Sequence, residues 1–135
     1  MRLFLFFPLL INYATSSFEV VMVKTTPTIQ DSLIDAIIHV ESRGDSMAYN
    51  AGEDAVGVLQ IRPIMMREVN RLLKENKYTL DDRWSKSKSI EMFNVIKAHT
   101  TNPTNERLAR NWNGGWNGYK KKSTLKYWNK VKTQL

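Results

Sequence analysis

One glutamate stands out because of its place in a helical pattern. The i, i+3, i+4, i+7 spacing that puts side chains on one helix face is filled by Ile34, Ile37, Ile38 and Glu41. Glu41 therefore ends an apolar stripe. Burial disfavours the charged form of a carboxyl group and raises its pKa, so such a group can serve as a general acid near neutral pH. A capping or ion-pairing role for Glu41 at the helix end fits the same spacing.

The helix that carries Glu41 is expected to begin near Thr28 and to stop at Gly44, as a glycine just past a helix end would make it do. A loop then runs from Asp45 to Val56. Pro63 opens a second helix, because a missing N–H costs nothing at the first helical position. The sequence thus places a loop that could face a ligand directly after Glu41.

A second stretch with chemical potential is the Gly-, Asn- and aromatic-rich run from Asn113 to Tyr119. Glycine lets the backbone approach a ligand closely, and flat rings stack on sugar faces. The alternative is a tight turn with Trp112 and Trp116 plugging the core.

Further helical patterns complete the chain and would position these residues. The second helix is expected to end at Asn76, and its inward stripe comprises Met65, Val69, Leu72 and Leu73. The third covers about Ser89 to His99, and Asn102-Pro103 begins the fourth. Asp82 is read as a helix cap or as an ion-pair partner of Arg83. The last helix follows Ser123 or Thr124 and would point Leu125, Trp128, Val131 and Leu135 inward. These patterns predict a mainly α single domain with at most a small β-hairpin in the loop after the Glu41 helix.

The run Glu41-Ser42-Arg43-Gly44, followed by the segment Gly57–Pro63 (GVLQIRP), resembles the paired signature of the lytic transglycosylase (SLT) domain. That family belongs to the lysozyme-like superfamily, near the goose-type lysozymes. Its third motif reads Ala-Tyr-Asn-Ala-Gly. Residues 48–52 spell it, but they precede Gln60, which is the wrong order. The better-placed match is residues 111–115, where Trp112 replaces the tyrosine. The resemblance spans Ile29 to about Tyr119.

The resemblance implies a lysozyme-like fold and one catalytic acid, Glu41. The acid would protonate the glycosidic oxygen between N-acetylmuramic acid and N-acetylglucosamine, and the product would carry an anhydromuramyl end. The expected substrate-binding residues are Ser42, Tyr49, Gly57, Leu59, Gln60, Trp112 and Asn113. Two alternatives remain open. One is a muramidase that uses Glu53 or Asp54 as a second carboxylate, and the other is a non-catalytic wall-binding module.

The amino-acid composition limits the classes of molecule that the protein is expected to bind. The chain has 135 residues, with 20 Lys and Arg against 13 Asp and Glu, and it has no cysteine. That length suits one domain, and no disulfide or thiolate metal site can form. No cofactor and no metal are expected. A basic surface favours polyanions, so transient contact with a membrane or an anionic wall polymer is expected beside the peptidoglycan strands, although the lysines of residues 120–132 also fit a solvated face. No nucleic-acid motif is present, and a monomer is expected.

The N-terminus resembles a secretory signal. Met1-Arg2 precedes an apolar run from Leu3 to Ile11, and residues 14–16 fit a small-x-small cleavage site. The predicted organisation is a signal peptide over residues 1–16, an extended arm over 17–27 and the domain over 28–135. A membrane tether or a buried segment is the alternative for residues 1–16. The expected location is secreted, periplasmic or at the cell envelope, and a phage-encoded or virion-associated protein fits equally.

Overall fold

The computed structural model describes residues 29–135, with side chains from Ser32 onward. The expected signal peptide and arm lie outside the described residues. Five helices form the fold: α1 (Ile29–Ser42), α2 (Pro63–Leu73), α3 (Lys86–Ala98), α4 (Asn105–Gly114) and α5 (Leu125–Lys132). Between them lie a hairpin of β1 (Tyr49–Asn50) and β2 (Ala55–Val56) and the 3-10 turns η1 (Asp81–Trp84), η2 (Gly118–Lys120) and η3 (Lys122–Thr124). The prediction of a mainly α domain with one small hairpin is confirmed.

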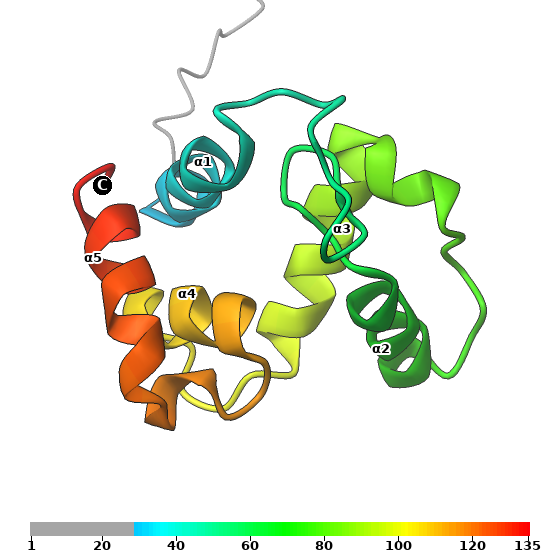
Figure 1. Cartoon of the computed structure of the whole chain (residues 1–135). Helices are drawn as coiled ribbons and strands as arrows, with labels where there is room; N and C mark the ends of the chain where they lie inside the picture. Colours follow the sequence, from blue (N-terminus) through cyan, green and yellow to red (C-terminus); the bar gives the residue numbers. More distant parts are fainter. Residues whose placement is uncertain (1–28) are drawn as a thin grey trace, which may run out of the picture.

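The helices divide into two groups that share one core. Helix α5 packs against both α1 and α4, and α2 packs against α3 (Figure 1). The connection from α1 to α2 crosses the top of the molecule and carries the hairpin. The cleft residues discussed below therefore come from both groups.

The apolar stripe of α1 is buried as its spacing predicts. Ile34, Ile37 and Ile38 are at most 6% exposed and belong to the main core cluster. On the other side of the core, the rings of Phe93 and Trp112 lie 5.1 Å apart and are tilted to each other, which suits aromatic packing. This core fixes the face of α1 on which Glu41 lies.

A buried arginine holds the hairpin loop. Arg83 is 5% exposed, and its Nη1 donates to the carbonyl oxygens of Asp54 at 2.7 Å and Ile61 at 3.1 Å. Its guanidinium also lies 3.7 Å from the Asp54 carboxylate. Two loop carbonyls are thereby satisfied away from water, where an unpaired group would be costly. The loop that follows Glu41 is anchored on η1 rather than free.

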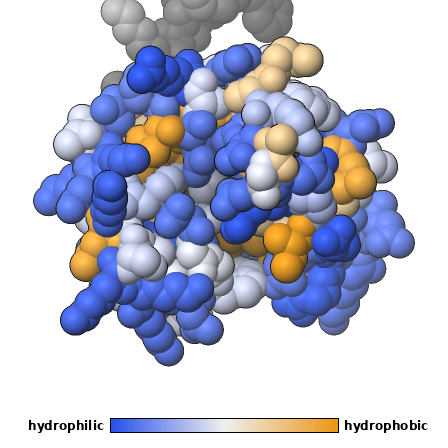
Figure 2. Space-filling view, in the orientation of Figure 1, coloured by the Kyte–Doolittle hydropathy of each residue, from blue (hydrophilic) through white to orange (hydrophobic). Residues whose placement is uncertain are grey.

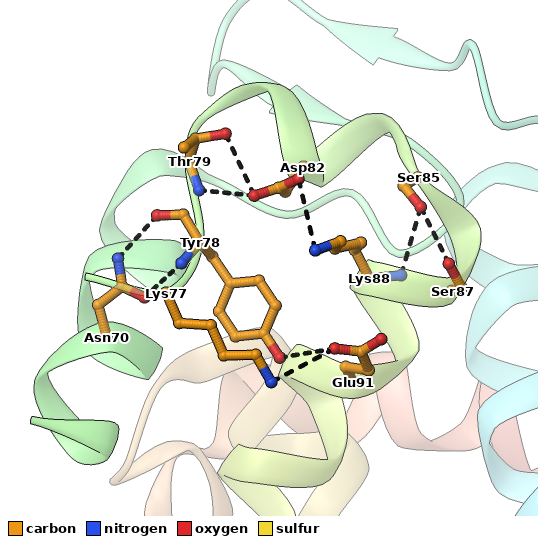
Figure 3. Close-up of polar contacts among 9 residues, drawn as sticks. All are labelled: Asn70, Lys77, Tyr78, Thr79, Asp82, Ser85, Ser87, Lys88 and Glu91. Atoms are coloured by element: carbon orange, nitrogen blue, oxygen red, sulfur yellow. Dashed lines mark hydrogen bonds and ion pairs between the residues drawn. The ribbon is translucent and has the colours of Figure 1, made fainter. Parts of the chain in front are cut away.

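Part of the prediction for Asp82 was wrong. Its carboxylate accepts hydrogen bonds from Thr79, and its ion-pair partner is Lys88 at 4.0 Å rather than Arg83 (Figure 3). The interaction with Thr79 closes the turn that leads into η1. Arg83 instead binds Asp54, which lies 29 residues away along the chain, through a hydrogen bond and an ion pair.

Asn70 joins α2 to the segment before α3. Its side chain donates to the Tyr78 carbonyl at 2.8 Å and accepts from the Tyr78 N–H at 2.9 Å (Figure 3). The Tyr78 hydroxyl in turn donates to Glu91 on α3 at 3.0 Å. These bonds fix the long connection between the helices, so α2 presents a constant face to the cleft.

Several helix boundaries differ from the prediction. Helix α2 ends at Leu73, because Lys74 takes the left-handed conformation with φ 55°. Helix α3 starts earlier, at Lys86, with Ser85 as its cap. Helix α4 starts later than expected, since Thr104 caps it by accepting from Arg107.

The inward face of α5 was predicted only in part, since Trp128 packs against the core as expected but the two leucines expected there do not. Leu125 is 41% exposed and Leu135 is 50% exposed, while Val131 is fully buried as expected. The face shown in Figure 2 is mostly hydrophilic, with separate apolar patches between hydrophilic side chains. Across the described chain, no helix combines the length and the apolar character that crossing a membrane requires.

Candidate active site

Glu41 lies in the last turn of α1 and lines a small polar pocket of about 180 Å³. Its neighbours in the pocket come from the hairpin, the loop after it, α2 and α4. They are Asn50, Glu53, Ala55, Gln60, Arg62, Met65, Trp112 and Asn113. The pocket therefore brings together four of the eight residues expected in the site: Glu41, Gln60, Trp112 and Asn113.

A tyrosine from the last helix binds the Glu41 carboxyl group. The Tyr127 hydroxyl donates to Glu41 Oε1 at 2.7 Å. Burial raises the pKa of Tyr127 well above its usual value, and the adjacent Glu41 carboxylate adds to that effect. Tyr127 therefore stays protonated and acts as a permanent donor to one oxygen of the acid.

The pKa of Glu41 is raised above the usual carboxyl value, mainly because the group is buried. The hydrogen bond from Tyr127 acts against burial, since it favours the charged form. The negative charge of Glu53 raises the pKa further, and the positive charge of Arg62 lowers it. Burial has the largest effect on this pKa, so Glu41 keeps its proton to a higher pH than an exposed glutamate does.

The second carboxylate of the pocket is Glu53 and not Asp54. Glu53 lines the pocket with Glu41, whereas Asp54 pairs with the buried Arg83. Sequence alone left both residues open as partners of the acid. The anchoring of the loop by Arg83 separates them, because it draws Asp54 toward η1.

Gln60 is held by its own loop. Its side-chain N–H group donates to the carbonyl oxygens of Ala48 at 3.1 Å and Gly57 at 3.0 Å. Its backbone has φ 47°, a left-handed conformation that non-glycine residues seldom adopt. Strained backbone of this kind is retained where the surroundings over-determine it. The arrangement commits the amide nitrogen to the loop and leaves the amide oxygen of Gln60 at the pocket.

Trp112 supports the pocket from α4. The residue is 5% exposed, and its indole N–H donates to the Leu59 carbonyl at 3.3 Å. It thus ties α4 to the segment that carries Gln60, while its ring forms part of the wall. Asn113, the next residue, is exposed and lines the same pocket, so its amide is available to a ligand.

The other four expected residues do not line this pocket. Ser42 donates to the Val58 carbonyl at 2.9 Å and clamps the end of α1 to the loop. Leu59 is fully buried. Gly57 has φ 76°, and a Cβ there would lie 2.3 Å from the Arg83 carbonyl oxygen, so only glycine fits. Tyr49 is 59% exposed, with its ring 6.2 Å from that of Trp84.

A larger pocket of about 490 Å³ adjoins the first. The two share Arg62, Met65, Trp112 and Asn113. The larger pocket extends between α2 and the Gly114-Gly115 turn after α4. The two adjoining pockets are together called the cleft: the one at Glu41 is polar, and the one beyond Trp112 is mostly apolar.

Tyr127 was missed by the sequence analysis. The expected inward residues of α5 were Leu125, Trp128, Val131 and Leu135. Trp128 and Val131 do pack in the core, whereas Leu125 and Leu135 are exposed, and the buried Thr124 and partly buried Tyr127 were not expected there. The i, i+3, i+7 spacing of Thr124, Tyr127 and Val131 was a usable signal. The larger apolar residues Leu125, Trp128 and Leu135 suggested a different inward face. Sequence alone does not show which of the two patterns is buried.

The cleft offers no ligand set for a metal. Within residues 29–135, no three His, Asp or Glu side chains come together as metal ligands do. The site holds a partly buried acid with a hydrogen-bond donor on one oxygen, the second carboxylate of Glu53, amide groups and one guanidinium. These groups define a mainly α protein with a carboxyl-based cleft, suited to acid catalysis at an uncharged polar bond.

The profile of the transglycosylase SLT domain matches residues 20–132, which is most of the chain. The chain therefore belongs to the transglycosylase SLT family, whose members cleave cell-wall peptidoglycan by lytic transglycosylation. Searches among curated proteins and among solved structures give no significant match.

Proposed function

We propose that this chain is a peptidoglycan lytic transglycosylase with Glu41 as its catalytic acid. The observation that carries the proposal is the state of Glu41: a carboxyl group with a burial-raised pKa, at the edge of a cleft, with Tyr127 bound to Oε1. Membership of the SLT family supplies the substrate class.

The proton can be followed through the reaction. Tyr127 occupies Oε1, which leaves Oε2 of Glu41 to carry the acidic proton. This proton passes to the glycosidic oxygen as the bond to the muramoyl C1 breaks, and the substrate's acetamido group stabilises the resulting cation. The Glu41 carboxylate then takes the proton of the muramoyl C6 hydroxyl, whose oxygen closes the anhydro ring. No water is consumed, and the intramolecular attack gains from proximity.

Neutral amides would hold the sugar in this scheme. The free amide oxygen of Gln60 and the exposed amide of Asn113 can accept and donate hydrogen bonds without titrating. The Trp112 ring provides an apolar wall beside them. Binding and proton transfer are thus assigned to different residues.

A hydrolase is the second candidate, and Glu53 is the observation that favours it. Glu53 lines the same pocket as Glu41 and influences its pKa, so it is the carboxylate that could activate a water molecule. A muramidase would leave reducing muramoyl ends, in contrast to the anhydromuramyl ends of a transglycosylase.

Digestion of purified peptidoglycan, followed by mass spectrometry of the fragments, tests the proposal. Anhydromuramyl fragments lack one water relative to reducing fragments, so the two outcomes are distinct. Wild-type protein should release anhydro ends, and Glu41→Gln should release no fragments. Reducing ends dependent on both Glu41 and Glu53 would establish the hydrolase instead. Fragment release by Glu41→Gln at the wild-type rate would remove Glu41 from the mechanism.

The location follows from the substrate. We infer that the protein acts outside the cytoplasm, where peptidoglycan lies. Exposed lysines on and before α5, including Lys122, Lys126 and Lys130, would favour contact with anionic polymers or lipids there. Fractionation of the producing cells, with a cytoplasmic enzyme as marker, tests this location.

A further inference from the structure

Arg62 stands at the junction of the two pockets. It lines both of them, directly before α2, and its side chain is partly buried. Its guanidinium makes no hydrogen bond and no ion pair with any residue from Ser32 to Leu135. Its charge reaches Glu41 as an attraction that lowers the pKa of the acid. A planar guanidinium suits two parallel hydrogen bonds to a carboxylate, so Arg62 is available to bind an anionic group of a ligand.

Among the described residues, no other arginine lines these two pockets, and three arginines on neighbouring elements already have partners. Arg83 binds the hairpin loop, and Arg110 pairs with Glu106 at 2.7 Å and donates to Thr124 at 2.9 Å. Arg71 pairs with Glu68 at 2.7 Å. Arg62 is thus the arginine of the described cleft whose guanidinium N–H groups have no hydrogen-bond partner from Ser32 to Leu135.

The larger pocket next to Arg62 is mainly apolar. Its walls include Ile64 and Met65 of α2, Ile96 of α3 and the ring of Trp116. The hydrogen bond from the Trp116 indole N–H to Glu68 Oε1, at 2.7 Å, joins the turn after α4 to α2 across this pocket. The pocket is therefore a built space between α2 and α4, suited to small apolar side chains with an anionic group at one end.

Arg71 and Trp116 keep Glu68 charged. Their hydrogen bonds, the one from Arg71 foremost, lower the pKa of Glu68 to about 2 despite the cost of burial. Arg71 neutralises the charge of Glu68 in an ion pair at 2.7 Å, whereas Arg62 and Lys121 line the pocket without an ion-pair partner among residues 32–135. An occupant that carries carboxylate groups along an apolar backbone complements this pattern.

The substrate carries such a group next to the cleaved bond. Muramic acid differs from N-acetylglucosamine by a lactyl ether, and in the wall polymer the lactyl carboxyl group bears a short peptide. That stem contains alanine methyl groups, free carboxylates and an amino group. Because the two pockets adjoin at Arg62, the substituent of a muramoyl unit at the acid would lie next to the larger pocket.

We propose that the larger pocket binds the stem peptide of the muramoyl residue, with Arg62 as the carboxylate-binding group that selects peptide-bearing glycan. The inference rests on the proposed function for the identity of the ligand. It adds a specificity that the glycosidic chemistry alone does not require. Arg62 occupies the position before Pro63, so its side chain is set by the same turn that begins α2.

The test measures binding without turnover, in a Glu41→Gln background. Three disaccharides serve as ligands in calorimetry: N-acetylglucosaminyl-N-acetylmuramic acid with its stem peptide, the same disaccharide with a free lactyl carboxyl group, and di-N-acetylchitobiose. We expect the peptide-bearing ligand to bind about 10-fold more tightly than chitobiose, as a charge-assisted bidentate contact allows. Adding Arg62→Gln should remove that advantage and leave chitobiose binding within about 2-fold.

Two further variants sharpen the comparison. Arg62→Lys keeps the charge but loses the planar fork, so it should retain only part of the preference. Arg67→Gln removes an exposed positive charge from the same helix outside both pockets, so the preference should persist. Circular dichroism of each variant confirms that its helices are intact.

Each other outcome has a defined meaning. Equal loss of affinity for all three ligands would make Arg62 a sugar contact and overturn the inference. Loss that is as large for the free lactyl ligand as for the peptide-bearing one would place the carboxylate on the lactyl group and overturn the stem assignment. Wild-type cleavage of peptidoglycan without any stem preference leaves the proposed function standing and refutes the inference. An Arg62-dependent preference for the stem peptide, without cleavage of peptidoglycan by the wild-type protein, would support the inference and refute the proposed function.

Discussion

Tyr127 on α5 donates a 2.7 Å hydrogen bond to Glu41 on α1, across 86 positions of sequence. The packing of α5 on α1 therefore does two things: it completes the core through Val131, and it supplies a donor to the candidate acid. The donor fixes the orientation of the carboxyl group and moderates the rise in its pKa. Substitutions on α5 should consequently change the orientation and the pKa of Glu41 on α1.

Tyr127→Phe should lower peptidoglycan cleavage by about 10- to 100-fold, because the acid loses the contact that orients it. The hydrogen bond favours the charged form of Glu41, so its removal raises the pKa of Glu41 further. The active form of an acid is the protonated one. The alkaline limb of the pH–rate profile should thus move to higher pH.

Tyr119→Phe provides the matched control for Tyr127→Phe. Tyr119 is exposed and stacks on Arg107, with 4.7 Å between the guanidinium carbon and the ring centre. Its variant should keep the wild-type rate and pH profile. An alkaline limb that stays in place for Tyr127→Phe would show that the hydroxyl does not act on the acid.

Glu53→Gln should displace the alkaline limb in the opposite direction. The negative charge of Glu53 raises the pKa of Glu41, so its removal lowers that pKa, and activity should decline at a lower pH. Cleavage at pH 5 should remain within about 3-fold of wild type if Glu53 is not a base, since a general base contributes about 100-fold or more. A loss of that size would instead support the hydrolase.

Glu41→Gln should stabilise the protein at neutral pH while it abolishes cleavage. The raised pKa means that the folded state binds the Glu41 proton more tightly than the unfolded chain, so the free energy of unfolding falls as pH rises from below 4.5 through the folded-state pKa. The neutral amide avoids this loss. Its Tm should exceed that of wild type by roughly a few degrees at pH 7.

Scanning calorimetry from pH 3.5 to 8 checks the stability of Glu41→Gln. The difference in Tm should shrink as the pH falls below the usual carboxyl pKa of 4.5, where Glu41 is protonated in both states. A constant difference across this range would mean that the stabilisation arises from something other than the ionisation of Glu41.

Arg83→Met should destabilise the fold by about 1–3 kcal/mol, since the Asp54 carbonyl loses its donor from Arg83 and the Ile61 carbonyl keeps only the N–H of Val56. The Gln60 loop should loosen, and activity should fall with it. Urea unfolding measures the loss. Arg67→Met on the exposed face of α2 is the control and should change stability by about 0.5 kcal/mol or less. Equal effects of the two variants would refute the anchoring role.

Asn113→Ala and Gln60→Ala should separate binding from stability. Asn113 is exposed, so its truncation should weaken the binding of sugar fragments about 5- to 10-fold and leave unfolding unchanged. Gln60 also donates to the carbonyls of Ala48 and Gly57, so its truncation should lower stability by about 1–2 kcal/mol as well. Calorimetry and urea unfolding on both variants make the comparison. Unchanged sugar binding by Asn113→Ala would remove that residue from the site.

The sequence alone determined the local part of this protein. The spacing of Ile34, Ile37 and Ile38 identified the buried face of α1 and hence the inward position of Glu41. Pro63 marked the start of α2. Helix α1 ends at Ser42, and the left-handed conformation expected at Gly44 begins one residue earlier, at Arg43. These features depend on side-chain periodicity and backbone preference over a few residues, which a sequence displays directly.

Only the tertiary structure decided which residues meet across the chain. Sequence offered both Glu53 and Asp54 as a second carboxylate, and the distant Arg83 removed Asp54 by pairing with it. The sequence analysis did not place Tyr127 inward, and the packing of α5 on α1 brought its hydroxyl to the partly buried Glu41. These choices depend on contacts between residues far apart in sequence, where burial and hydrogen bonding together select one arrangement among several that local pattern leaves equal.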